Sequence, residues 1–151
     1  MNTVVVRQAV ETDLEKLAPL FDAYRRFYGA AGDIPAASAF LADRIVRGES
    51  AVFMALEGDV AVGFTQLYPS FSSVSLARIF VLNDLFVVER ARRKGIAAKL
   101  IAAAVDHAGT EAAARLTLST ARGNHGAQAL YESLGWKRDD RFLVYNFSLP
   151  A

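Results

Sequence analysis

The chain has 151 residues, of which 53% are hydrophobic, and it contains no cysteine. This length suits one domain with a buried core, and the lack of thiols excludes disulfides, thiolate zinc sites and an acyl-cysteine intermediate. The chain has 17 basic and 16 acidic residues and a net charge of +1, which argues against a broad nucleic-acid surface.

The N-terminal half predicts a strand, two helices and a hairpin. We expect the strand at Thr3 to Ala9 and a helix capped by Thr12 or Asp13. Two strands at Ala51 to Leu56 and Val60 to Tyr68 flank a short turn and predict an antiparallel hairpin. Apolar residues recur at helical spacing in each of the two helices: Leu14, Leu17, Leu20, Phe21, Tyr24 and Phe27 in the first, and Phe40, Leu41, Ile45 and Val46 in the second.

The C-terminal half predicts a strand–helix–strand unit followed by a closing helix and strand. A long strand at Leu76 to Val88 precedes a helix with apolar positions from Ile96 to Ala108. Arg115 to Thr120 returns as a strand, which makes the unit a right-handed crossover. Asn124 to Leu134 predicts the last helix. Arg141 to Leu149 alternates like a strand and is expected to pair within the subunit or across a dimer.

The most informative segment joins the long strand to the helix after it. It is a basic turn with one glycine, Arg92-Arg93-Lys94-Gly95, before an alanine-rich amphipathic helix. Backbone N–H groups at a helix N-terminus are unpaired and lie at the positive end of the helix dipole, so they bind phosphate groups. Gly95 lets the backbone approach the anion, and Ala97 keeps the first helical turn thin. The segment predicts a pyrophosphate site, and the alternative is a solvated basic turn.

Two motifs carry a resemblance to a known family. The spacing Arg92-x-x-Gly95-x-Ala97 resembles the Arg/Gln-x-x-Gly-x-Gly/Ala signature of the GCN5-related N-acetyltransferase (GNAT) superfamily, whose loop holds the coenzyme A pyrophosphate. Residues 124–136 resemble the family's Asn-x-x-Ala-x-x-Leu-Tyr-x-x-x-Gly-Phe segment. Within the superfamily the chain looks most like the subgroup of histone, polyamine and diamine acetyltransferases. The resemblance implies an α/β fold in a single acetyltransferase domain over residues 1–151. It also implies a central mixed, mostly antiparallel sheet of six to seven strands and about four flanking helices.

The resemblance also implies acetyl-CoA as cosubstrate, and two histidines without clustered carboxylates make a metal site unexpected. The backbone of Phe86, Val87 and Val88 would bind the pantetheine arm as an added strand. Asn124 and Tyr131 would face the coenzyme. The residues expected to bind the pyrophosphate, mainly through backbone N–H groups, are Arg92, Arg93, Lys94, Gly95, Ile96 and Ala97.

Acetyl transfer to an amine requires two proton movements. A lysine-like amine has a pKa near 10.4, so presenting it neutral at pH 7 costs about 4–5 kcal/mol unless a base helps. Asp84 is the candidate base or amine anchor, directly or through water, although it could equally bond backbone at a bulge or hold Arg78. Tyr131 is the candidate acid for the leaving thiolate, since the family places this hydroxyl beside the sulfur. Tyr131 could instead only pack the last helix against the sheet. His125 lies beside Asn124 and could be catalytic, but an exposed or helix-capping residue is the alternative.

The leading hypothesis is direct acetyl transfer to a primary amine of a small molecule such as a polyamine or amino acid. Acetylation of a protein lysine or N-terminus, and a non-catalytic acyl-CoA-binding regulatory module, are the alternatives. A Rossmann-like nucleotide site is disfavoured because the turn has one glycine. The sequence does not exclude an aminoacyl-tRNA as the acceptor.

We expect aromatic side chains to line the acceptor side: Tyr24, Phe27, Tyr28, Tyr68 and Phe71. Of these, Phe27 is more typical of a core residue. No long apolar segment or leader pattern is found, which favours a cytoplasmic protein without a membrane or nucleic-acid partner. The apolar last strand favours a homodimer.

Overall fold

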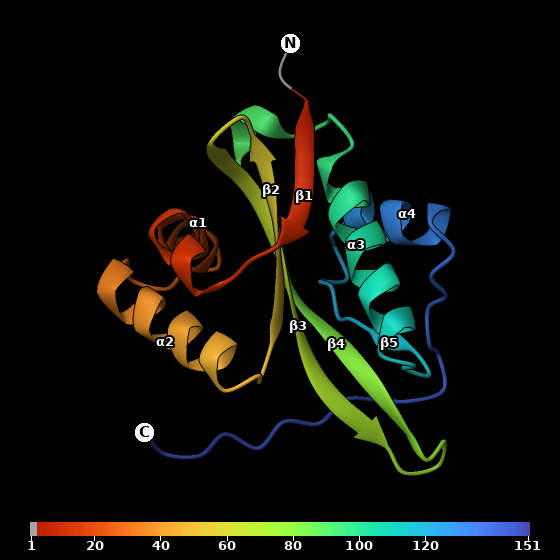
Figure 1. Cartoon of the computed structure of the whole chain (residues 1–151). Helices are drawn as coiled ribbons and strands as arrows, with labels where there is room; N and C mark the ends of the chain where they lie inside the picture. Colours follow the sequence, from red (N-terminus) through yellow and green to blue (C-terminus); the bar gives the residue numbers. More distant parts are fainter. Residues whose placement is uncertain (1–2) are drawn as a thin grey trace. The chain divides into compact units, whose positions relative to one another are not determined.

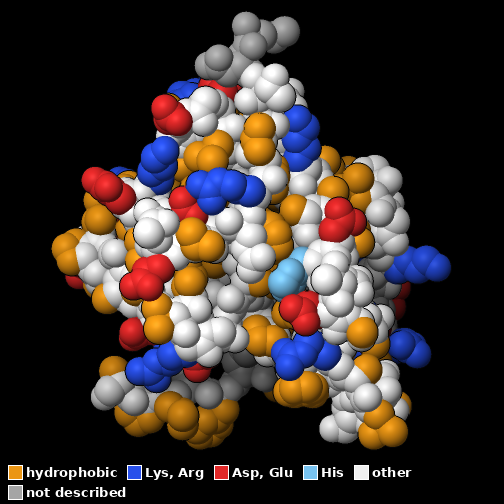
Figure 2. Space-filling view, in the orientation of Figure 1, with side chains coloured by type: hydrophobic (Ala, Val, Ile, Leu, Met, Phe, Trp, Pro, Cys, Tyr) orange, Lys and Arg blue, Asp and Glu red, His pale blue; other side chains and the backbone are white. Residues whose placement is uncertain are grey.

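The computed structural model describes residues 3–151, which fall into two compact units. The first unit ends at Ser119, and the second runs from Thr120 to Ala151. On the face drawn in Figure 2, basic and acidic side chains are interspersed, as the near-zero net charge leads one to expect. None of the helices formed by residues 3–151 is long and apolar enough to cross a membrane.

One mixed sheet organises the first unit (Figure 1). Its strands, in spatial order, are β1 (Val4–Gln8), β2 (Ala51–Glu57), β3 (Val60–Ser72), β4 (Ala77–Val87) and β5 (Leu116–Thr117). The first four are antiparallel neighbours, whereas β5 is parallel to β4. The mixed, mostly antiparallel α/β sheet is therefore confirmed, but residues 3–151 form five strands rather than six to seven.

Helices cover both faces of the sheet. α1 (Leu14–Phe27) and α2 (Ile34–Val46) lie on one face, and α3 (Ile96–Thr110) lies on the other (Figure 1). Consecutive residues of β3 point to opposite faces. Phe64 contacts Phe21 of α1, with ring centroids 5.8 Å apart, whereas a Cβ added at Gly63 would lie 3.3 Å from the Leu100 side chain of α3.

Each face has its own buried core. On the α1/α2 face, Leu17, Leu41, Met54 and Phe64 are fully buried. On the other face, α3 buries most of the side chains that the sequence pattern predicted: Ile96, Leu100, Ile101, Ala104 and Ala108. Val105, which the pattern also assigned to this face, is 45% exposed. The two cores hold the sheet between its helices and fix the ends of β4 and α3.

Asp13 occupies the N-cap position of α1, as predicted, but its side chain makes no capping hydrogen bond to the helix. A short 3₁₀ turn, η1 (Glu11–Asp13), precedes the helix. The Arg7 guanidinium donates to both carboxylate oxygens of Asp13, at 2.7 and 2.8 Å, and the Val10 N–H donates at 2.8 Å. The hydrogen bonds from Arg7 lower the pKa of Asp13 to about 2. The carboxylate thus ties β1 to the start of α1.

The second helix begins earlier than its apolar pattern indicated. Asp33 caps α2, because its side-chain oxygen accepts a hydrogen bond from the Ala36 N–H at 3.1 Å. Pro35 lies in the first turn, where the missing N–H of proline costs no helical hydrogen bond. α2 therefore includes Ile34 and Pro35, which precede the apolar positions from Phe40 to Val46 on which the prediction rested.

The second unit contains the last helix, α4 (His125–Ser133), and no strand. The prediction of a strand at Arg141 to Leu149 within this subunit is wrong for this structure. Alternation marks a segment that can form a strand, but a strand also needs a partner edge. The apolar side chains of the segment remain exposed, from 71% for Phe142 to 88% for Phe147.

Candidate active site

The basic turn places a row of backbone donors at the start of α3. A short 3₁₀ turn, η2 (Glu89–Ala91), follows β4, and Gly95 then adopts a left-handed conformation with φ of +77°. The first helical bond is donated by the Lys99 N–H to the Gly95 carbonyl, at 3.2 Å. Within residues 3–151, the backbone N–H groups of residues 93–98 donate no hydrogen bond. These groups are available to an anion.

Arg92 differs from the other cations of the turn. Its Nε donates to the Val87 carbonyl at 2.8 Å, and its guanidinium lies 5.6 Å from the Phe27 ring and 5.7 Å from the Phe86 ring. Arg92 therefore joins the turn to β4 and α1. Arg93 and Lys94 are exposed and extend from the turn without ion pairs in the described chain.

One edge of β4 is open beside this turn. β5 pairs with β4 at Phe80 and Val81, so the following residues of β4 have no strand partner on that side within the described chain. The Val88 N–H donates to the Val62 carbonyl of the neighbouring β3 segment, at 2.9 Å. In an antiparallel ladder the backbone N–H and C=O groups of alternate residues point to the same neighbouring strand. The backbone groups of Phe86 therefore also point to β3, and of the three predicted pantetheine residues only Val87 points its backbone groups to the open edge.

Asp84 is a buried carboxylate held by side-chain amides. It is 4% exposed, and its oxygens accept hydrogen bonds from Gln66 Nε2 at 2.7 Å and from Asn83 Nδ2 at 3.1 Å. A register shift leaves Asn83 without a counterpart on β3, so the predicted bulge is present. The Asp84 side chain binds these amides rather than the backbone or Arg78.

Two phenols lie close to the same carboxylate. Burial, followed by the negative charge of Asp84, raises the pKa of Tyr24 above its usual value. The same two causes raise the pKa of Tyr68 to about 12. Both phenols are therefore neutral hydrogen-bond donors at physiological pH.

Gln66 is the residue of this cluster that the sequence analysis did not single out. It lies in the middle of the apolar strand β3 and is fully buried. Its Nε2 donates to Asp84, whereas its Oε1 is buried with no hydrogen-bond partner in the described chain. Because a buried polar side chain is costly unless its groups are bonded, the single glutamine in an apolar strand was the available signal.

Aromatic side chains connect the carboxylate to the turn. The Phe86 ring lies 5.9 Å from Tyr24 and 6.1 Å from Phe27. Phe27 is 63% exposed, so the expectation that it belongs to the core is wrong; it lies at the last turn of α1, beyond the edge of the core. Tyr28 continues this exposed wall, whereas Phe71 lies elsewhere, against Arg78.

The C-terminal unit holds the other two predicted site residues on and before α4. The Asn124 side chain caps the helix by accepting a hydrogen bond from the Ala127 N–H at 3.2 Å. Tyr131 is partly buried, and its ring lies 6.0 Å from that of Trp136. His125 is exposed as the first helical residue. Among residues 3–151, no three side chains of His, Cys, Asp or Glu gather as a metal site would need.

The mixed α/β sheet carries free backbone N–H groups before α3, an arrangement that can bind a phosphorylated ligand. The sequence model of the acetyltransferase (GNAT) family matches residues 17–136, and the chain belongs to this family. It is an N-acetyltransferase. Enzymes of the family use acetyl-CoA as cosubstrate.

Relatives resemble the chain over nearly its whole length. The uncharacterized N-acetyltransferase YhfO of Bacillus subtilis is 48% identical over 146 residues, which cover 97% of this chain and 98% of the relative. The D-amino-acid N-acetyltransferase HPA3 of Saccharomyces cerevisiae is 29% identical over 143 residues, covering 92% and 89%. A crystal structure of a probable acetyltransferase superimposes with a TM-score of 0.92 at 42% identity, covering 97% of this chain and 99% of that one.

Proposed function

We propose that the chain transfers the acetyl group of acetyl-CoA directly to a primary amine of a small molecule, such as a polyamine or an amino acid. The observation that carries this proposal is the buried Asp84 carboxylate, clamped by Gln66 and Asn83 on the strand that leads to the anion-binding turn. A carboxylate beside aromatic rings suits an alkylammonium group. The name of the yeast relative, a D-amino-acid N-acetyltransferase, supports an amino-acid acceptor.

The proposed reaction uses groups from both units. Backbone N–H groups of the turn hold the pyrophosphate, and the Val87 backbone holds the pantetheine arm. Asp84 accepts a proton from the acceptor ammonium, directly or through water, and the neutral nitrogen attacks the thioester carbonyl. The C–N bond forms, the C–S bond breaks, and Tyr131 donates a proton to the departing sulfur. The acylated nitrogen then releases its second proton, which restores the Tyr131 hydroxyl. We propose that both units work as one domain over residues 1–151, which the family match across both units supports.

Calorimetric titration with acetyl-CoA, followed by a thiol-release assay, tests the function. The acceptors are polyamines, L- and D-amino acids and lysine peptides, so that the small-molecule and protein alternatives compete in one experiment. Micromolar binding with fastest turnover on a small amine is expected. Faster turnover on a lysine peptide would overturn the small-molecule assignment, and no acetyl-CoA binding would overturn the site.

Tyr131→Phe separates catalysis from binding. Removing the hydroxyl should lower kcat by about tenfold to 100-fold if the phenol is the acid, with the acetyl-CoA dissociation constant within about twofold of wild type. An unchanged kcat would assign Tyr131 to packing against Trp136 instead.

We also propose that the enzyme is a homodimer. The support is the C-terminal segment, in which alternating apolar side chains from Phe142 to Leu149 are exposed. An unpaired apolar segment is a template for pairing with a second chain. Light scattering should give the mass of two chains for the full protein and of one chain after truncation at Asp140.

A further inference from the structure

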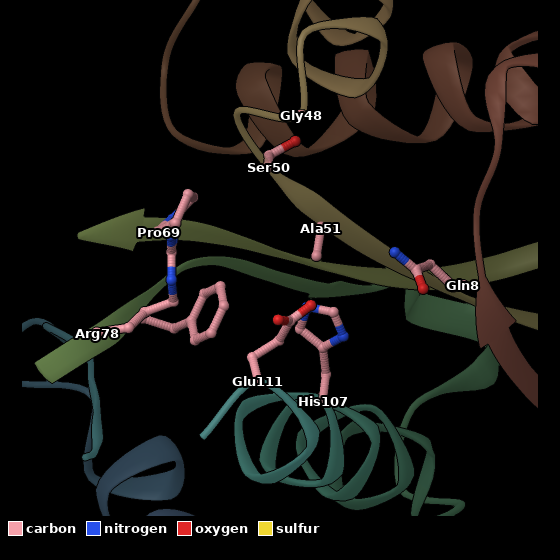
Figure 3. A pocket seen from close by; sticks show the side chains of 9 residues that line it. Gln8, Gly48, Ser50, Ala51, Pro69, Arg78, His107 and Glu111 are labelled. Atoms are coloured by element: carbon pink, nitrogen blue, oxygen red, sulfur yellow. The ribbon is translucent and has the colours of Figure 1, made fainter. Parts of the chain in front are cut away.

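A polar cavity of about 280 Å³ lies in the first unit, away from the proposed coenzyme turn (Figure 3). It is bounded by the end of β1, the start of β2, strands β3 and β4, and the C-terminal end of α3. His107 follows Ile96 by 11 residues, which corresponds to about 16 Å along a helix. The lining residues are Gln8, Gly48, Ser50, Ala51, Pro69, Arg78, Phe80, His107 and Glu111.

Charges of both signs line this cavity without neutralising each other. The Arg78 guanidinium lies 4.8 Å from the Phe71 ring centroid and 6.0 Å from that of Phe80. These rings restrain the guanidinium, yet Arg78 forms no ion pair within residues 3–151. Glu111 rises from α3 on the other side (Figure 3) and also has no ion pair in the described chain.

Two further polar side chains, His107 and Ser50, line the same cavity. The His107 ring is held by edge-on contacts with Phe53 and Phe80, at centroid distances of 5.4 and 5.3 Å. Its side chain rises from α3 next to Glu111 (Figure 3). Ser50 Oγ is buried and has no hydrogen-bond partner in the described chain. A fixed imidazole and an unpartnered hydroxyl are groups that a polar ligand can satisfy.

We propose that this cavity is a second binding site, for a small zwitterion of the α-amino acid type. Arg78 would bind the carboxylate, and Glu111 would bind the ammonium group. A simple anion would leave Glu111 uncompensated beside it, and a simple cation would do the same for Arg78. The volume lies just below the range of about 300–1,000 Å³ typical of ligand pockets, which suits a small metabolite.

The first experiment identifies a ligand and its required charges. Each of the 20 standard L-amino acids is screened by thermal shift on the full-length protein, since a ligand that binds only the folded state raises Tm. Calorimetry then compares the best binder with its analogues that lack the amino or the carboxyl group; for leucine these are 4-methylpentanoate and 3-methylbutylamine. Both analogues should bind about tenfold more weakly or worse. No amino acid binding at millimolar concentration, or equal binding of either analogue, would overturn the proposal.

The second experiment locates the site. Arg78→Gln and Glu111→Gln should each weaken amino acid binding about tenfold or more. Arg115→Gln and Asp106→Asn are matched controls that do not line the cavity, and both should bind normally. Asp84→Asn should keep the component of amino acid binding that Arg78→Gln and Glu111→Gln remove, which separates this site from the acceptor site. Binding that survives Arg78→Gln and Glu111→Gln, or that is lost in Asp84→Asn, would overturn the assignment.

Discussion

The turn before α3 and the Asp84 cluster on β4 follow each other closely in the chain, but they offer different chemical groups. The turn offers backbone N–H groups set by the left-handed Gly95, and its nearest arginine side chain is used to hold β4 and α1. The Asp84 cluster offers side chains brought together from β3, β4 and α1. We therefore expect the turn to tolerate charge changes but not changes of backbone, and the cluster to depend on individual side-chain atoms.

The largest expected effect is on the Asp84 cluster. Asp84→Asn removes the negative charge while keeping the shape, and kcat should fall by about 100-fold or more because the base or ammonium anchor is lost. The acetyl-CoA dissociation constant should stay within about twofold, since the turn is built from other residues. Steady-state kinetics and calorimetry measure the two quantities. A fall in kcat below about threefold would remove Asp84 from the reaction.

The next largest effect is on the turn. Gly95→Val forces a branched side chain into a left-handed conformation beside the anion, so acetyl-CoA binding should weaken about 30-fold. Arg93→Glu should weaken it only about fivefold, because an exposed charge is screened by solvent. Calorimetry measures both dissociation constants. Gly58→Val is the matched control, because Gly58 also has positive φ, +62°, and open space around its Cβ. Equal losses in Gly95→Val and Arg93→Glu would contradict a backbone-built site.

A smaller effect is expected at Gln66. Gln66→Leu removes the amide that holds Asp84 Oδ2, so kcat/KM should fall about tenfold and its pH profile should shift, because the carboxylate loses a donor. Stability should also fall, by about 1–3 kcal/mol, because the buried carboxylate loses a donor. Removal of the unpartnered Oε1 offsets part of this loss.

Thr65→Val is the control for Gln66→Leu. Thr65 Oγ1 donates to the Asp84 backbone carbonyl at 2.8 Å, so its loss should cost about 1 kcal/mol of stability with little effect on kcat. A large fall in kcat/KM for Thr65→Val together with an unchanged kcat/KM for Gln66→Leu would contradict the prediction. It would show that the position of the Asp84 backbone, rather than the hydrogen bond from Gln66, determines activity.

The smallest expected effect is on stability and concerns Asp13, which lies outside both regions. Its pH dependence serves as a reference for the pH profiles of the two regions. Arg7 lowers the pKa of Asp13 from 3.8 to about 2, so the pair stabilises the fold above pH 4 and this stabilisation disappears as the pH falls through 2. Solvent screening of the half-exposed Arg7 limits it to about 1–2 kcal/mol. Urea unfolding between pH 5 and 2 should show this loss in the wild type and not in Asp13→Asn. Parallel curves for the two proteins would contradict the pair's contribution.

The elements that depend on neighbouring residues could be predicted from the sequence. Helical periodicity located α3, and a basic turn with one glycine before it located the free N–H groups, because both are local properties of the chain. The position of Asp84 before this turn also followed from the order of residues. That position did not reveal the amide clamp.

What required the tertiary structure was every feature that joins distant segments. Gln66 meets Asp84 only because β3 and β4 pair in one register, and the Asp13 side chain binds Arg7 of β1 rather than an N–H group of α1. The alternating segment at residues 141–149 forms no strand in this structure, although its pattern is typical of one. The sequence by itself determined the helical periodicity of α3 and the turn with free N–H groups that precedes it. Strand number, side-chain partners and exposure were decided by the tertiary structure, because a hydrogen bond or a buried surface needs a partner that lies elsewhere in the chain.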